Sequence, residues 1–122
     1  MAWQRLSSKT RRDKTLPPFL RLSANLLIWG KATDRLLGIP THVNLMIDED
    51  AKRIGVCSAS TDDPDAFQVD RSTTSARIRV RMVLEGAGLQ CVRVDSRTAF
   101  QDGNIVGIDA PEVFRPAKEP TP

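Results

Sequence analysis

The stretch RLLGIPTHVNLMIDEDAKRIGV, residues 35–56, decides the fold. Gly38 stands where a preceding helix has to end, because glycine adopts a left-handed backbone at little cost. Pro40 then forces its predecessor into extended backbone. Residues 43–48 alternate between apolar and polar side chains with a period of two, and a polar turn joins them to an apolar segment at 53–56. The stretch therefore predicts the end of a short helix followed by a β-hairpin.

A second hairpin is predicted immediately upstream. Residues 19–23 and 26–29 are apolar segments of strand length, and the turn between them contains Asn25, a residue type that tolerates positive φ. Residues 31–37 then form a candidate helix that ends at Gly38. The first half of the chain is thus expected to run strand, strand, helix, strand, strand.

The second half has a weaker pattern. Residues 72–89 fit both an alternating strand and a helical spacing, and we expect a short strand that runs into a helix ending near Gly86. The sequence shows no internal repeat of useful period. Further strands are expected at 67–69, 91–94 and 105–108.

Length and composition limit the architecture. A chain of 122 residues, 40% of them hydrophobic, fits one domain with one modest core. We expect an α+β fold, mostly β, built as a small barrel or sandwich of β-hairpins with one or two short helices. The domain should span 16–109, between a flexible basic arm at 1–15 and a Pro-rich disordered tail at 110–122. Because short hairpins bury little surface alone, a homodimer is also expected.

The sequence argues against a membrane protein and against catalysis. No apolar run approaches the roughly 20 residues of a membrane helix, and the N-terminus lacks the apolar centre of a secretory signal, which predicts a cytoplasmic protein. Cys57 and Cys91 are far apart, so two reduced thiols in strands are preferred to a disulfide. The only histidine, His42, lacks zinc-ligand or nucleophile partners at useful spacing. We expect no enzyme activity, metal or cofactor.

Arginine and lysine provide the remaining functional signal in a chain of net charge +3. Arg77, Arg79 and Arg81 would project from one face of a strand, about 6.6 Å apart, where they could follow a phosphate backbone. The alternative is a solvated polar face. A basic N-terminal arm could likewise contact nucleic acid or act only as a solubilising tail. The candidate nucleic-acid-binding residues are Arg5, Lys9, Arg11, Arg12, Lys14, Arg77, Arg79 and Arg81.

Residues 20–59 resemble the AbrB/MazE type of swapped-hairpin DNA-binding domain. The segment ATDRLLGI supplies the helix end, VNLMIDED the strand and acidic turn, and RIGV the return strand. The resemblance implies an intertwined dimer with a basic face, as in transcription regulators and antitoxins. It also implies that Arg35 contacts DNA, which adds Arg35 to the candidate residues.

These observations lead to two functional hypotheses. The first is a small nucleic-acid-binding or transcription-regulator-like protein that contacts phosphates through a basic surface, with DNA favoured over RNA. The alternative is a small accessory or inhibitor protein, of the kind carried by a phage or mobile element, that docks on a protein complex. The size of the chain and its lack of catalytic motifs suit both hypotheses.

Overall fold

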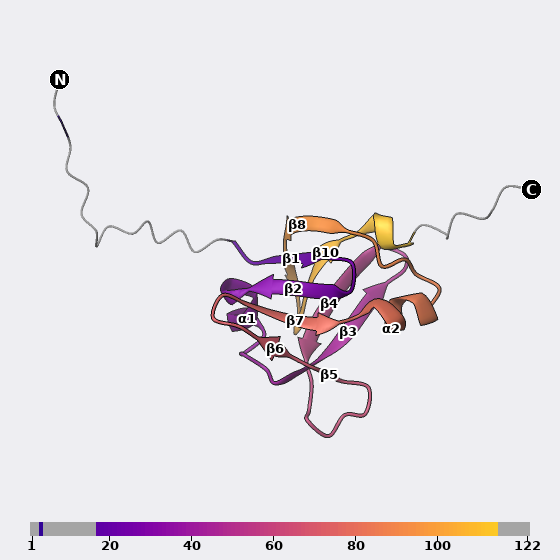
Figure 1. Ribbon diagram of the computed structural model, residues 1–122, viewed down its shortest axis with the longest axis horizontal. Coiled ribbons are helices and arrows are strands. Elements are labelled where there is room, and N and C mark those ends of the chain that lie inside the picture. The colour runs from indigo at the N-terminus through magenta and orange to yellow at the C-terminus, as the bar shows by residue number, and fades with distance from the viewer. Residues whose placement is uncertain (1–2, 4–16, 115–122) are drawn as a thin grey trace, which may run out of the picture.

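A computed structural model describes Trp3 and residues 17–114 of the chain (Figure 1). The described strands form two five-stranded sheets in which every pairing is antiparallel. Sheet A contains, in spatial order, β6 (Asp70–Arg71), β7 (Ser75–Arg79), β2 (Leu26–Gly30), β1 (Phe19–Leu22) and β8 (Val94–Thr98). Sheet B contains β5 (Phe67–Gln68), β3 (His42–Asp48), β4 (Arg53–Ser58), β10 (Ile105–Asp109) and β9 (Phe100–Asp102). The helices are α1 (Lys31–Leu36), α2 (Arg81–Gly86) and the 3-10 helix η1 (Pro111–Phe114).

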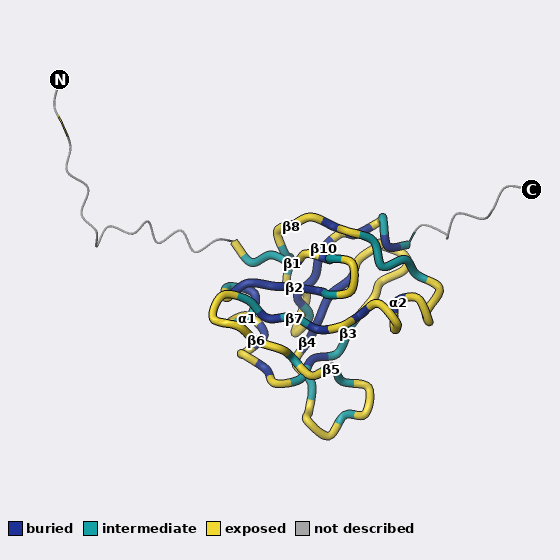
Figure 2. The backbone as a smooth tube through the Cα atoms, in the orientation of Figure 1, coloured by how far each residue is buried: buried dark blue, intermediate teal, exposed yellow. Residues whose placement is uncertain are grey.

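One hydrophobic core lies between the two sheets (Figure 2). Leu20 and Trp29 of sheet A and Ile54 and Ile108 of sheet B are almost completely buried in the same cluster. Alternate residues of each strand enter this core, as the period of two requires. The expected mostly β fold with two short helices is confirmed, but in the described part of the chain the sheets do not close into a barrel. None of the helices within it is long and apolar enough to cross a membrane.

The predicted hairpins and helices are present. β1 and β2, and β3 and β4, pair as antiparallel neighbours, and the ambiguous stretch 72–89 is a strand followed by a helix, as expected. The buried Thr33 joins α1 to β1, because its hydroxyl donates to the Phe19 carbonyl (2.7 Å) and accepts from the Phe19 N–H (2.8 Å). This fully satisfied polar contact fixes where the helix sits against the first strand.

The turn after α1 contains two consecutive residues with positive φ. Gly38 has a φ of 82°, as its position at the helix end predicts, but Ile39 follows with a φ of 52°. A β-branched residue is costly in this conformation.

We expect Ile39→Asn to raise the free energy of unfolding by about 0.5–1 kcal/mol, because asparagine adopts left-handed backbone more easily. Ile39 is 60% exposed, so little buried apolar contact is lost. Urea denaturation of the two proteins measures the difference. A variant less stable than the native chain would contradict the prediction.

The two halves of the chain repeat one order of elements, although the sequence shows no repeat. The first half runs β1, β2, α1, β3, β4, and the second runs β6, β7, α2, β8, β9, β10 with the same hairpin pairings, so only β8, and β5 between the halves, have no counterpart. The halves meet through two central antiparallel pairs, β2 with β7 and β4 with β10. Apart from β5 and β8, the strand order of both sheets is unchanged when the two halves are exchanged, so the lack of a repeat in the sequence does not extend to the topology. Each half completes the sheets of the other.

Two predicted boundaries are wrong. A strand was expected at 91–94, but β8 begins only at Val94. Val94 is opposite Leu22, the last residue of β1, so the residues before Val94 have no residue of β1 to pair with. The tail was expected from residue 110. Ala110 and Val113, however, are fully buried in the core, and Pro111–Phe114 form η1. Burial of these apolar side chains holds the segment against the sheets in spite of the local proline content. Apart from Trp3, the expected arm at 1–15 lies outside the described residues, as do 115–122.

Candidate nucleic-acid interface

Three arginines lie on the outer face of sheet A. Arg21 of β1 is directly opposite Ile28 of β2, which is directly opposite Arg77 of β7. Residues paired in this way point to the same side of a sheet, away from the core that Leu27 and Trp29 enter. Arg79 is two residues beyond Arg77 and shares its face. We call Arg21, Arg77 and Arg79 the arginine face.

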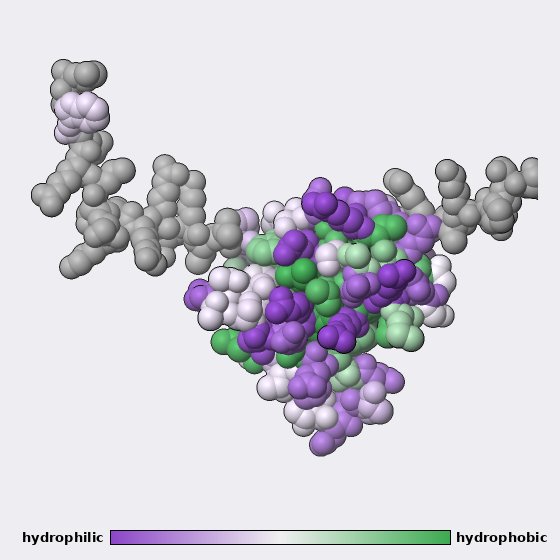
Figure 3. Space-filling model, in the orientation of Figure 1, coloured by the Kyte–Doolittle hydropathy of each residue, from purple (hydrophilic) through white to green (hydrophobic). Residues whose placement is uncertain are grey.

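The spacing of the arginine face suits contacts with a phosphate chain. Arg77 and Arg79 are about 6.6 Å apart along the strand, and Arg21 lies two strand spacings from Arg77, about 9.6 Å. In Figure 3, where β1, β2 and β7 lie toward the viewer, hydrophilic side chains surround a few apolar ones. Planar guanidinium groups on such a surface can each donate two hydrogen bonds to one phosphate.

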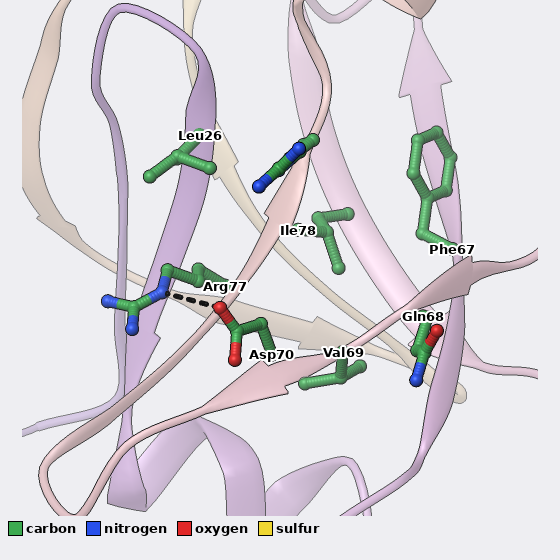
Figure 4. A pocket seen from close by; sticks show the side chains of 8 residues that line it. Leu26, Phe67, Gln68, Val69, Asp70, Arg77 and Ile78 are labelled. Carbon is green, nitrogen blue, oxygen red and sulfur yellow. Dashed lines mark hydrogen bonds and ion pairs between the residues drawn. The ribbon is translucent and has the colours of Figure 1, made fainter.

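The charges of the arginine face are largely uncompensated. Arg77 pairs with Asp70, the residue directly opposite it in the neighbouring strand β6, with Nε 3.3 Å from the Asp70 oxygen (Figure 4), but the Asp70 side chain is 75% exposed. Such a solvated pair contributes little and can be exchanged for another anion. Arg21 and Arg79 have no ion-pair partner within the described residues. At least two of the three cations are therefore available to a ligand.

A pocket with basic residues in its lining lies at the end of the β2–β7 pair. The last residues of that pair, Gly30 and Ser75, line it together with Lys31 and Arg35 of α1. Ser72 and Thr73 of the turn between β6 and β7 line the same pocket, as do Asp34 and Arg71, which form an ion pair with each other. Cationic and hydroxyl side chains are common phosphate ligands. Arg35, which the family resemblance had added to the candidates, therefore lies beside the arginine face.

Arg81 does not extend the row as the sequence predicted. The chain turns into helical backbone at Val80, with φ −118° and ψ −11°, so Arg81 begins α2 instead of continuing β7. Its guanidinium lies 3.0 Å from a Glu85 oxygen and 3.3 Å from the Asn25 side-chain oxygen. The other candidates, Arg5, Lys9, Arg11, Arg12 and Lys14, lie outside the described residues.

Arg21 and Lys31 were not among the sequence candidates. Arg21 stands alone between the buried Leu20 and Leu22, and only the register of β1 against β2 brings it beside Arg77. The signal in the sequence that could have indicated Arg21 was a single charged residue at an outward-facing position of an otherwise apolar strand. Within residues 17–114, however, acidic side chains outnumber basic ones, so the excess positive charge of the chain lies mainly in its terminal segments.

His42 and the two cysteines are the other residues whose chemistry the sequence analysis considered. His42 begins β3, and its Nδ1 lies 3.0 Å from the Thr41 hydroxyl. Both cysteines are free, but only Cys57 lies in a strand. Burial raises the pKa of the Cys91 thiol, which lies 3.3 Å from the Ala24 carbonyl. In the part of the chain that the structure describes, no three His, Cys, Asp or Glu side chains are grouped to hold a metal.

The candidate site is defined only by the geometry of this structure, because no comparison with known proteins assigns a residue to it. No family model, no curated protein and no solved structure matches this chain.

Proposed function

We propose that this protein binds nucleic acid through the phosphate backbone, using the arginine face as its central contact. The observation that carries the proposal is the register of β1, β2 and β7, which gathers Arg21, Arg77 and Arg79 on one exposed sheet surface. No catalytic step is part of the proposal. On this view the two sheets form a sandwich of hairpins in which sheet A is the binding layer and sheet B supports it.

The surrounding features support the same assignment. Lys31 and Arg35 extend the positive surface past the end of the sheet, beside the hydroxyl groups of the β6–β7 turn. Acidic side chains elsewhere would repel a polyanion and so orient its approach toward this face. The basic residues at 5–14 would add contacts that carry no base specificity. We propose DNA over RNA, and a cytoplasmic protein, in line with the swapped-hairpin resemblance.

Exchange of the two unpaired arginines tests the proposal. We expect Arg21→Gln/Arg79→Gln to weaken binding to a short duplex DNA at least about tenfold at low salt, and to reduce the slope of log affinity against log salt by about 1.8. Fluorescence anisotropy over a salt titration measures both quantities. The loss should be the same for unrelated duplex sequences, because phosphate contacts do not read bases.

A matched pair of arginines away from the arginine face provides the control. Arg53→Gln/Arg93→Gln removes the same charge from residues whose guanidinium groups pair with Asp109 and Asp95. It should leave the salt slope close to that of the native chain. Equal losses in both variants would mean that net charge alone drives binding, and no binding at low salt would exclude the proposal.

One observation favours the alternative, docking on a protein complex. Met82 is 87% exposed and Val83 is 49% exposed on the short helix α2, where apolar side chains gain nothing from solvent. A partner retained from nuclease-treated lysate by the native chain, and lost with Met82→Ser/Val83→Ser, would support this function. Homodimerisation stays a prediction, although the two halves of one chain already complete both sheets.

A further inference from the structure

The outer face of sheet B contains a shallow groove whose apolar lining includes Met46, Phe100 and Ile105. Met46, Gly55, Gly107 and Phe100 lie opposite one another in successive strands, from β3 to β9. The Phe100 ring lies over Gly107, with its Cζ 3.0 Å from where a Cβ atom of Gly107 would be, and the Ile105 side chain lies over Gly55 at the same distance. Met46 is 38% exposed. Met46, Phe100 and Ile105 therefore offer an apolar surface that an apolar side chain can contact.

The rim of this groove is acidic. Asp48, the last residue of β3, and Glu49 of the following turn line it on one side and Asp102 of β9 on the other. The single cation in its lining, Arg53, is engaged, because its Nε lies 2.8 Å from an Asp109 oxygen and its guanidinium lies 4.6 Å from the centre of the Phe100 ring. A polypeptide segment that fits this groove should carry positive charges around an apolar residue.

The N-terminal segment enters the fold beside this groove. The Ala99 N–H donates to the Pro18 carbonyl at 2.7 Å, and Ala99 directly precedes Phe100, which lines the groove. β9, which begins at Phe100, is the edge strand of sheet B. The chain upstream of residue 17 thus begins next to one wall of the groove.

We propose that residues 4–14 of the same chain dock in this groove. The segment QRLSSKTRRDK has the required chemistry, with Leu6 among five basic residues and one acidic residue. Its 11 residues can extend over about 36 Å, whereas four strands span only about 14 Å. Opposite charges and a short connection to Pro18 make docking within one chain favourable, because the connection gives the segment a high effective concentration.

Limited trypsin digestion of the full chain tests the docking. Trypsin cleaves after Lys9, Arg11, Arg12 and Lys14, and a docked segment should resist it. We expect Glu49→Gln/Asp102→Gln at low salt to speed cleavage in this segment about fivefold relative to the native chain, since two rim charges are lost. Mass spectrometry of the released N-terminal fragments gives the rates.

Asp62→Gln/Asp65→Gln is the matched control, because it removes two carboxylates from the exposed loop after β4 and should leave the rates unchanged. Glu49 lies in an exposed turn, so Glu49→Lys should also speed cleavage of the N-terminal segment. This variant leaves the residues of β9 unchanged, so its effect does not depend on the folding of β9. Rates equal to native in both groove variants would overturn the proposal. Native rates that fall as protein concentration rises would assign the groove to the segment of a second copy and would also overturn it. The outer faces of the two sheets lie on opposite sides of the core, so docking of this segment and its contacts with nucleic acid bound to sheet A are alternatives. No nucleic acid is present in the digestion, so its result is independent of the proposed function.

Discussion

A Gly107→Ala variant should unfold with a free energy about 2–3 kcal/mol below that of the native chain. A Cβ atom at residue 107 would lie 2.6 Å from the Ile54 carbonyl oxygen and 3.3 Å from the Gly55 Cα. The Phe100 ring, whose Cζ would lie 3.0 Å away, could move aside, but the other two obstacles belong to the backbone of β4 and no side-chain rotation can relieve them. The central β4–β10 pair has to separate, at the point where the two halves of the chain meet.

A glycine in open space supplies the control for this prediction. Gly86 ends α2, and a Cβ atom there would meet no heavy atom within 4 Å. Gly86→Ala should therefore leave stability unchanged or raise it by up to about 1 kcal/mol through helix propensity. Urea denaturation of both variants gives the two differences, which should have opposite signs. A Gly107→Ala protein as stable as the native chain would show that β4 and β10 are not this close.

Substitution of the facing glycine extends the same argument. A Cβ atom at Gly55 would lie 2.8 Å from the Val106 carbonyl oxygen, so Gly55→Ala should also destabilise the protein. The double variant Gly55→Ala/Gly107→Ala should cost less than the two single changes together, because strands already separated by one methyl group accommodate the second more easily.

The local elements of the first half could be predicted from the sequence because their signals are local. Gly38 marks the end of α1, and alternation over 43–48 marks β3, without knowledge of the rest of the chain. The strand followed by a helix at 72–89 was likewise predictable from its mixed periodicity. Each of these features depends on residues within a few positions of one another.

The repeat was not predictable from the sequence because the two halves share backbone arrangement and few residue types. The largest core residue of β2 is Trp29, whereas the largest core residue of β7 is the much smaller Ile78. The clearest common feature is the glycine in RIGV and IVGI, residues 53–56 and 105–108. A single glycine is too common to indicate duplication, and its meaning becomes clear only when Gly55 and Gly107 are seen opposite each other.

Part of the candidate site could be predicted from the sequence, and the register of the strands explains why the rest could not. Arg77 and Arg79 share an exposed face of sheet A, as their alternation indicated, whereas Arg81 continues into a helix. Arg21 joins them although it is 56 residues from Arg77 in the chain. Which strands become neighbours is set by non-local pairing, and the alternation of side chains along one strand does not encode that choice.

The second large effect is expected for Asp34→Asn, which should lower the free energy of unfolding at pH 7 by about 2–3 kcal/mol. The Asp34 carboxylate receives hydrogen bonds from Arg71 Nε (2.8 Å) and Nη2 (2.7 Å) and from the indole N–H of the buried Trp29 (3.3 Å). Its side chain is only 13% exposed. The change would leave the Arg71 cation without its counter-charge and would weaken the link between α1 and β6.

The loss should depend on pH in one direction. Burial raises the pKa of Asp34, but the hydrogen bonds from Arg71 and Trp29 and the charge of Arg71 outweigh burial, so its pKa in the folded protein lies below the ordinary value of 3.8. Because the folded pKa is the lower one, the carboxylate stabilises the fold fully above the unfolded pKa of about 3.9. This contribution is lost as the pH falls through the folded value. The difference between native and Asp34→Asn should therefore be constant near neutral pH and shrink below about pH 4.

Urea denaturation between pH 7 and pH 2.5 measures this dependence. Asp109→Asn is the control, since Asp109 forms an exposed ion pair with Arg53 in which the side chains are 67% and 44% exposed. It should cost less than about 1 kcal/mol at neutral pH. If the cost of Asp34→Asn stayed the same down to pH 2.5, its carboxylate charge would not be what stabilises the junction between α1 and β6. Such a result would mean that the asparagine amide fails to replace the polar contacts of the carboxyl group even when that group is uncharged. Attraction to the charge of Arg71 would then not be what holds the junction together.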